Sequence, residues 1–187
     1  VLGDPRAVAT VPHRELAALM ASRGGLLTLE EAFEAFPRAR FNIDVKAAAV
    51  AEPLGRAVAP HAERVLVTSF SERLRVRALA AAARSGGRPA TSPGRGALIR
   101  LLLAVNARSR GGAARALAAY DALQIPERQG RVPVLGPRLI DEAHRAGVEV
   151  HVWTVNDPAR MAELVALGVD GVVTDRADAA LAALRPD

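Results

Sequence analysis

Hydrophobic and polar positions along the chain show two patterns, one typical of helices and one typical of buried strands. Apolar residues that recur every three or four positions predict helices, and short apolar runs between turn residues predict strands. The predicted helices span residues 13–22, 29–36, 50–59, 72–84, 97–105, 113–120, 137–146 and 159–167, and a last one ends near 184. The predicted strands span residues 41–46, 64–70, 88–92, 121–126, 148–155 and 171–175.

Local signals at helix ends and in loops add detail to this pattern. Thr28 with Glu31 three positions later predicts a capping box at the start of the second helix. Ser71 is in position to cap the helix that follows the second strand. Residues 109–112 and the polar stretch 127–136, which Gly and Pro mark, predict loops.

Strands that alternate with helices at this spacing favour parallel βαβ units, with strands buried on both faces. The pattern contains six such units. A closed (β/α)₈ barrel has eight strands in about 250 residues, so two arrangements remain open: an open doubly wound sheet, or a barrel whose first two units lie upstream. Helices 13–22 and 29–36 precede the first strand and favour the barrel.

Composition narrows the classes of protein to which the chain can belong. Its 187 residues match a single α/β domain, and half of them are hydrophobic while only 3% are aromatic, so Ala, Val and Leu must build the core. The net charge is +5, but the arginines are scattered, so no nucleic-acid partner is expected. Cysteine is absent, which excludes disulfides and thiolate metal sites. No apolar run approaches the ~20 residues of a membrane span.

The segment Phe41–Lys46 is the strongest candidate for chemistry. Lys46 is the only lysine of the chain, and its compact ammonium cannot be replaced by a planar guanidinium at a site that needs a point charge. Asp44 lies two positions earlier, so both side chains project from the same side of a strand, while Ile43 and Val45 face a hydrophobic layer. The alternative interpretation of the same spacing is an ordinary structural ion pair.

Four motifs, in matching order and spacing, resemble the glycerophosphodiester phosphodiesterase family over most of residues 27–184. They are Leu27–Pro37 (LTLEEAFEAFP), Phe41–Lys46 (FNIDVK), Val65–Phe70 (VLVTSF), and the pair Val150–Pro158 (VHVWTVNDP) with Leu167–Arg176 (LGVDGVVTDR). The resemblance implies a TIM-type barrel that hydrolyses glycerophosphodiesters to glycerol 3-phosphate and an alcohol. It also implies one divalent cation, usually Ca²⁺ or Mg²⁺, held by carboxylates at the carboxyl ends of strands.

The resemblance also assigns roles to individual residues. Asp44 would be a metal ligand, where the family more often has the longer Glu, and Lys46 would bind or neutralise the phosphate. Trp153 would form the wall of the cleft beside the glycerol or the leaving group. Ser69 and Gln124, near the ends of their predicted strands, are further candidates for polar contacts with the substrate.

The chain departs from the family pattern at three motifs. The H-R-G, E-x-D and H-D motifs, which in the family supply two catalytic histidines and two further metal ligands, do not occur here. His13, His61, His144 and His151 match neither family histidine in context; we expect His144 on a helix surface and His151 as a hydrogen-bonded core imidazole. We therefore expect this chain to be the later three quarters of the barrel, with about 60 residues upstream.

Three functional interpretations follow. The first is a metal-dependent phosphodiesterase that acts on a small-molecule substrate. The second is a barrel that has lost its acid and base residues and only binds phosphate or a partner protein, and the third is an unrelated phosphate-binding α/β enzyme. A cytoplasmic location is the default expectation, whereas the alcohol, the cation and the oligomeric state stay open. Without the first two strands, strands 41–46 and 171–175 would be unpaired sheet edges that invite pairing between chains.

Overall fold

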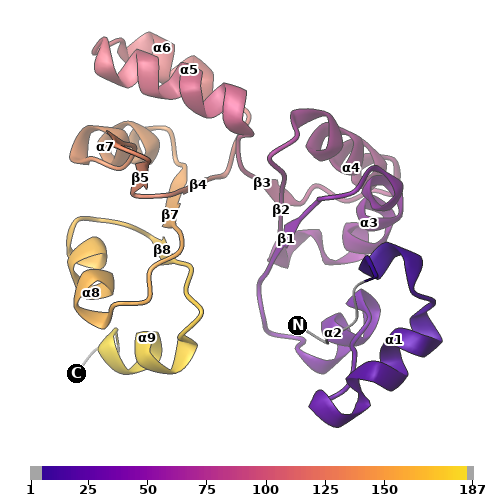
Figure 1. Cartoon of the computed structure of the whole chain (residues 1–187). Coiled ribbons are helices and arrows are strands. Elements are labelled where there is room, and N and C mark those ends of the chain that lie inside the picture. Colours follow the sequence, from indigo (N-terminus) through magenta and orange to yellow (C-terminus); the bar gives the residue numbers. More distant parts are fainter. Residues whose placement is uncertain (1–5, 185–187) are drawn as a thin grey trace. The chain divides into compact units, whose positions relative to one another are not determined.

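The structure is a computed structural model that describes residues 6–184. The chain forms two compact units, one up to Ala39 and one from Arg40 onward, and each is described by itself (Figure 1).

The first unit is helical. It contains the 3-10 turn Val8–Thr10, helix α1 (His13–Met20), the 3-10 turn Ala21–Arg23 and helix α2 (Leu29–Ala35). The capping box of α2 is confirmed: the Glu31 backbone N–H donates to Thr28 Oγ1 at 3.3 Å, and the Thr28 N–H donates to Glu31 Oε2 at 2.7 Å. The Glu31 carboxylate accepts this bond from the Thr28 N–H and a second one, at 3.0 Å, from the Thr28 hydroxyl, and both hold the pKa of Glu31 below its ordinary value.

The second unit alternates strands and helices. Its strands are β1 (Phe41–Asp44), β2 (Val65–Thr68), β3 (Ala90–Thr91), β4 (Ala122–Ile125), β5 (Arg128–Gln129), β6 (Val132–Pro133), β7 (Glu149–Val152) and β8 (Gly171–Val172). Its α-helices are α3 (Ala51–Val58), α4 (Glu72–Arg84), α5 (Arg95–Asn106), α6 (Arg110–Leu117), α7 (Pro137–Arg145), α8 (Pro158–Ala166) and α9 (Ala177–Ala183). The 3-10 turns Ala48–Val50 and Ala59–Arg64 flank α3.

Six of these strands are parallel and follow the order of the chain. They form the sheets β1-β2-β3 and β4-β7-β8. Asp121 joins the two sheets, because its N–H donates to Thr91 O at 2.9 Å and its carboxylate accepts from the Thr91 N–H at 2.9 Å. The order lacks the reversal that defines a doubly wound sheet, so the structure does not show the open doubly wound arrangement.

Three local predictions were wrong or incomplete. The stretch 127–136 is not a plain loop, because it contains the antiparallel hairpin β5-β6. Residues 109–112 are not a loop either: Ser109 is the N-cap of α6, and its hydroxyl accepts the Gly112 N–H at 3.2 Å. Ser71 occupies the N-cap position of α4, but its side chain makes no capping hydrogen bond.

Alternate strand residues divide the second unit into an apolar face and a polar face. Leu123, Ile125, Val150 and Val152 are fully buried in one cluster with apolar side chains of α5 to α8. Successive strand side chains point to opposite faces, so the residues between these apolar positions form the other face, which we call the inner face.

Among residues 6–184, none of the helices combines the length and the apolar composition that a membrane span requires.

Candidate active site

The candidate site is built on the inner face, at the carboxyl ends of the parallel strands. Asp44 ends β1, and Lys46 follows two positions later. The Lys46 Nζ atom lies 3.7 Å from Asp44 Oδ2, with the lysine side chain 80% exposed and the aspartate side chain 30% exposed. The structure thus brings together the acid and the amine that the two-residue spacing predicted on one side of the strand, and Val45 between them is buried.

Asp44 carries an unusual oxygen atom. Its Oδ1 is buried and has no hydrogen-bond partner within the described residues. An unsatisfied buried carboxylate oxygen is costly, so such an atom calls for an explanation such as an ion. Carboxylate oxygens are the ligands that Ca²⁺ and Mg²⁺ prefer, so Asp44 fits as one ligand of such a cation. Residues 6–184 contain no group of three or more His, Cys, Asp or Glu that could complete a metal site.

Two hydroxyl side chains, from β2 and from the residue after β3, follow Asp44 across the sheet. Thr68 on β2 is the register partner of Asp44. The Thr68 Oγ1 atom lies 2.8 Å from the Oγ of Ser92, which follows β3 and is 1% exposed. Neither residue was predicted as part of the site, although the two-residue period that carries Leu66 and Thr68 to the face of Asp44 could have indicated Thr68.

Ser69 contacts two backbone groups of the described chain. Its side chain is buried, and its hydroxyl donates to Val45 O at 2.6 Å and accepts the Ser71 N–H at 3.1 Å. Because both partners belong to the backbone, Ser69 ties the end of β1 to the segment after β2. Its contact with a substrate stays a prediction.

Gln124 and Trp153 lie on the inner face of the second sheet. Gln124, half-buried on β4, pairs in register with His151 on β7. Trp153 follows β7 and donates its backbone N–H to Ile125 O at 3.1 Å. Its ring meets Phe70 edge to face, with ring centroids 6.2 Å apart and an interplanar angle of 84°.

Phe70 is the aromatic partner of Trp153, and the sequence offered it only as part of the VLVTSF motif. Phe70 is 72% exposed, which is unusual for a large apolar residue. Edge-to-face packing against Trp153 favours a fixed orientation for both rings. The two aromatic residues come from segments after β2 and β7, so they connect the strand ends of the two sheets.

Two histidines pair with carboxylates, as expected for structural imidazoles. The His144 Nε2 atom lies 2.8 Å from Asp170 Oδ2, and His151 Nε2 lies 3.0 Å from Glu149 Oε2. His144 is exposed on α7, whereas the His151 side chain is only 20% exposed. Burial opposes the ionisation of Asp170, but hydrogen bonds from the Val150 N–H and from His144 keep its pKa below the ordinary value.

The fold and the site define a parallel α/β protein with an acid, an amine and an aromatic wall at its strand ends. Residues 7–179 match the model of the glycerophosphoryl diester phosphodiesterase family, so the chain belongs to that family. This result confirms the resemblance that the four motifs indicated.

One relative places the chain more closely within the family. The "Probable glycerophosphodiester phosphodiesterase 2" of Mycobacterium tuberculosis (strain ATCC 25618 / H37Rv) is 44% identical over 154 residues, which cover 81% of this chain and 57% of the relative. The chain thus spans less than two thirds of that relative's length.

Two solved structures share the fold. A glycerophosphodiester phosphodiesterase from Thermotoga maritima is 19% identical with a TM-score of 0.68, and the match covers 99% of this chain and 74% of that one. An Oleispira antarctica phosphodiesterase in complex with the product sn-glycerol-3-phosphate is 17% identical with a TM-score of 0.63, covering 96% of this chain and 72% of that one. At these identities the likeness concerns the fold alone.

Proposed function

We propose that the complete protein hydrolyses glycerophosphodiesters to glycerol 3-phosphate and an alcohol in a reaction that depends on a divalent cation. One observation carries this proposal: the buried Asp44 Oδ1 lacks a hydrogen-bond partner in the described chain, while Lys46 Nζ lies 3.7 Å from the other oxygen of the same carboxylate. Membership of the phosphodiesterase family supports the reaction. The glycerol 3-phosphate bound to the Oleispira antarctica structure supports the product.

The proposed roles follow from the position of each side chain. Lys46 is exposed and flexible, so its ammonium can approach a phosphate and stabilise the negative charge that develops in the transition state. Asp44 would hold the cation, Ca²⁺ or Mg²⁺, through Oδ1. When bound, the cation would act as a Lewis acid on the phosphate oxygens.

Trp153 and Phe70 would form the wall beside the glycerol or the leaving alcohol, because their rings are fixed against each other near the strand ends. Gln124 would offer its amide from β4. Ser69 would act through the backbone of Val45, directly after β1, which its hydroxyl holds. The chain lacks the family motifs that supply histidines, so no residue of this chain is assigned to proton transfer.

We further propose that the second unit belongs to a (β/α)₈ TIM-type barrel, of which this chain contributes about six βα units. The support is that six parallel strands adjoin one another in chain order, with Asp121 as the link between the two sheets. Barrel active sites lie at the carboxyl ends of strands, and the site residues described above lie at those ends.

The test of the reaction is the substitution Lys46→Met in the complete protein. Loss of one positive charge directed at the transition state costs about 10²–10³-fold in turnover, so we expect a loss of that size with glycerophosphocholine as substrate, measured by release of glycerol 3-phosphate. The matched control is Arg73→Met, which removes an exposed cation from α4. Full activity of Lys46→Met, with an unchanged circular dichroism spectrum, would exclude Lys46 from the mechanism.

The second candidate function is a catalytically incomplete barrel that binds phosphate or a partner protein. The observation that favours it is the lack of a cluster of metal-ligating side chains within residues 6–184. This alternative predicts that the complete protein binds glycerol 3-phosphate in equilibrium dialysis but releases none from a glycerophosphodiester. Turnover that requires added Ca²⁺ or Mg²⁺ would decide for the enzyme.

A further inference from the structure

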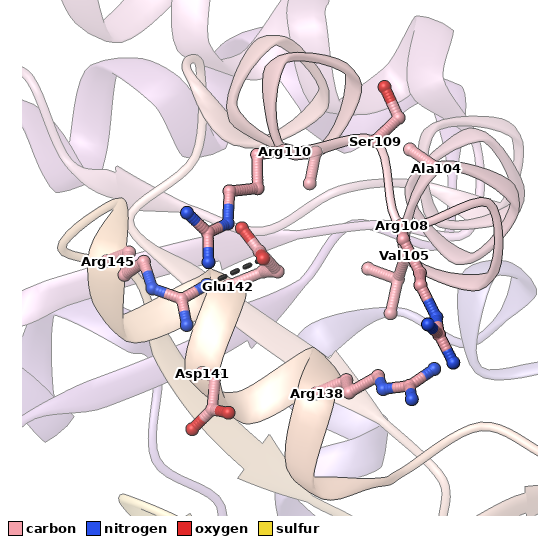
Figure 2. Close-up of a pocket in the computed structure, with 10 residues that line it drawn as sticks. Ala104, Val105, Arg108, Ser109, Arg110, Arg138, Asp141, Glu142 and Arg145 are labelled. Carbon is pink, nitrogen blue, oxygen red and sulfur yellow. Dashed lines mark hydrogen bonds and ion pairs between the residues drawn. The ribbon is translucent and has the colours of Figure 1, made fainter.

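A pocket lies among α5, α6 and α7 of the second unit (Figure 2). Its volume is about 210 Å³, and its lining comes only from these three helices and the link between α5 and α6. It shares no residue with the candidate active site, so it requires an explanation of its own.

The pocket concentrates positive charge. Four arginines and two acids line it: Arg108, Arg110, Arg138, Arg145, Asp141 and Glu142. Only Arg145 has an ion-pair partner within the described chain, because its Nη1 donates to Glu142 Oε1 at 2.6 Å. The guanidinium groups of Arg108 and Arg138 point toward the same space in Figure 2, although like charges repel each other.

Three of these arginines occupy positions that are unfavourable for the charge or for the backbone conformation of an arginine. Arg110 and Arg138 stand in the first turns of α6 and α7, where the helix dipole prefers anions, and neither first turn contains an acid. Arg108 has a φ of 54°, a left-handed conformation that side chains other than Gly, Asn and Asp rarely adopt. Sites where several local rules fail together are often functional, and a bound anion would offset the electrostatic cost.

We propose that this pocket binds a phosphate group, either free phosphate or a phosphomonoester or the phosphate of an anionic lipid headgroup. Planar guanidinium forks match phosphate oxygens with paired hydrogen bonds. The volume is below the roughly 300 Å³ at which pockets for drug-sized ligands begin, so it suits a small anion. The proposal does not depend on the phosphodiesterase activity.

The test measures the binding of inorganic phosphate to the complete protein by isothermal titration calorimetry at low ionic strength, without divalent cations. The variant R108Q/R138Q removes two facing guanidinium groups that are exposed, so the fold is retained. Losing two charge-assisted hydrogen bonds weakens binding by at least about tenfold. The control R73Q/R115Q removes the same charge from exposed positions outside the pocket and leaves the affinity unchanged.

Lys46→Met separates this pocket from the candidate active site. Phosphate binding that persists in Lys46→Met and falls in R108Q/R138Q supports the pocket. Binding that is lost in Lys46→Met and kept in R108Q/R138Q overturns it, as does an equal loss in R73Q/R115Q, which would show attraction to net charge alone.

A second binding experiment, with lipid vesicles, identifies the source of the phosphate group. Phosphatidylcholine vesicles with and without phosphatidic acid are sedimented with the protein and with R108Q/R138Q. Arginine-dependent binding to the vesicles that contain phosphatidic acid, without binding of inorganic phosphate, assigns a lipid headgroup; binding of inorganic phosphate assigns a soluble anion. No binding in either arm overturns the proposal, and so does arginine-dependent binding of a polyglutamate peptide alone, which would indicate a protein partner.

Discussion

At the scale of single residues, the sequence predicts which side chains share a face but not what each atom touches. The spacing of Asp44 and Lys46 was enough to place both on one side of β1. The isolation of Asp44 Oδ1 depends on neighbours from other segments, which no local pattern reveals. The edge-to-face contact of Phe70 with Trp153 likewise joins residues more than eighty positions apart.

Replacing Asp44 by Asn tests whether its carboxylate holds a cation. Without divalent ions the variant loses one ion pair, 3.7 Å long, to the exposed Lys46, so the free energy of unfolding should change by less than about 1 kcal/mol. With Ca²⁺ at a hundredfold excess over its Kd, the unsubstituted protein should gain about 2.7 kcal/mol, and the variant should lose most of this gain. Thermal unfolding of the complete protein at increasing CaCl₂ measures both quantities.

Asp178→Asn is the matched control, because Asp178 is an exposed acid that pairs with Arg176 at 3.4 Å. We expect it to keep the full Ca²⁺-dependent rise in Tm. An equal rise in Asp44→Asn would show that the cation binds elsewhere, and the orphaned oxygen would then need another explanation.

At the scale of secondary-structure elements, periodic patterns predicted all six parallel strands and placed the helices within a few residues of their observed bounds. The hairpin β5-β6 was missed because its strands have two residues each and all four side chains are exposed, so no alternation is visible. The start of α6 was missed because Gly111 and Gly112 are poor helix formers, and the Ser109 cap outweighed them.

Gly55 shows how closely helices α3 and α4 pack against each other. It lies inside α3, where Ala would ordinarily be favoured by about 1 kcal/mol. A Cβ at this position would lie 2.2 Å from Ala78 O of α4 and 2.7 Å from the Cβ of Ala81. Because backbone of α4 cannot yield cheaply, we expect Gly55→Ala to destabilise the protein by about 1–3 kcal/mol, measured by urea denaturation.

Gly96→Ala in α5 provides the opposite case within the same chain. A Cβ there would meet only the mobile end of Arg100, at 4.0 Å. The change should therefore leave stability unchanged or raise it by up to about 1 kcal/mol. If both substitutions had the same sign, the close approach of α3 and α4 would not be what requires glycine at position 55.

At the scale of the whole molecule, the family resemblance predicted what periodicity alone left open, namely the barrel rather than the doubly wound sheet. The observed order of the parallel strands agrees with that choice. It also determines which strands are at the edges, because within the described residues β1 pairs only with β2 and β8 pairs only with β7.

These edges lead to a prediction for residues 1–187 produced alone. An edge strand presents unpaired N–H and C=O groups that recruit a second chain, so the isolated chain should form oligomers that increase with concentration. Light scattering coupled to size-exclusion chromatography measures this. Val173→Lys places a charge beside β8 and should shift the population toward the monomer, because charged side chains at an edge oppose pairing.

Val76→Lys is the control for that substitution, since Val76 is a comparably exposed valine on α4 rather than at a sheet edge. It should leave the oligomer distribution unchanged, because the charge it adds is remote from the unpaired backbone groups. A monodisperse monomer of the unsubstituted chain would contradict the open edges, and the six parallel strands would then have to close on themselves. If Val173→Lys and Val76→Lys shifted the population toward the monomer equally, the chains would associate through general apolar contacts rather than through strand pairing.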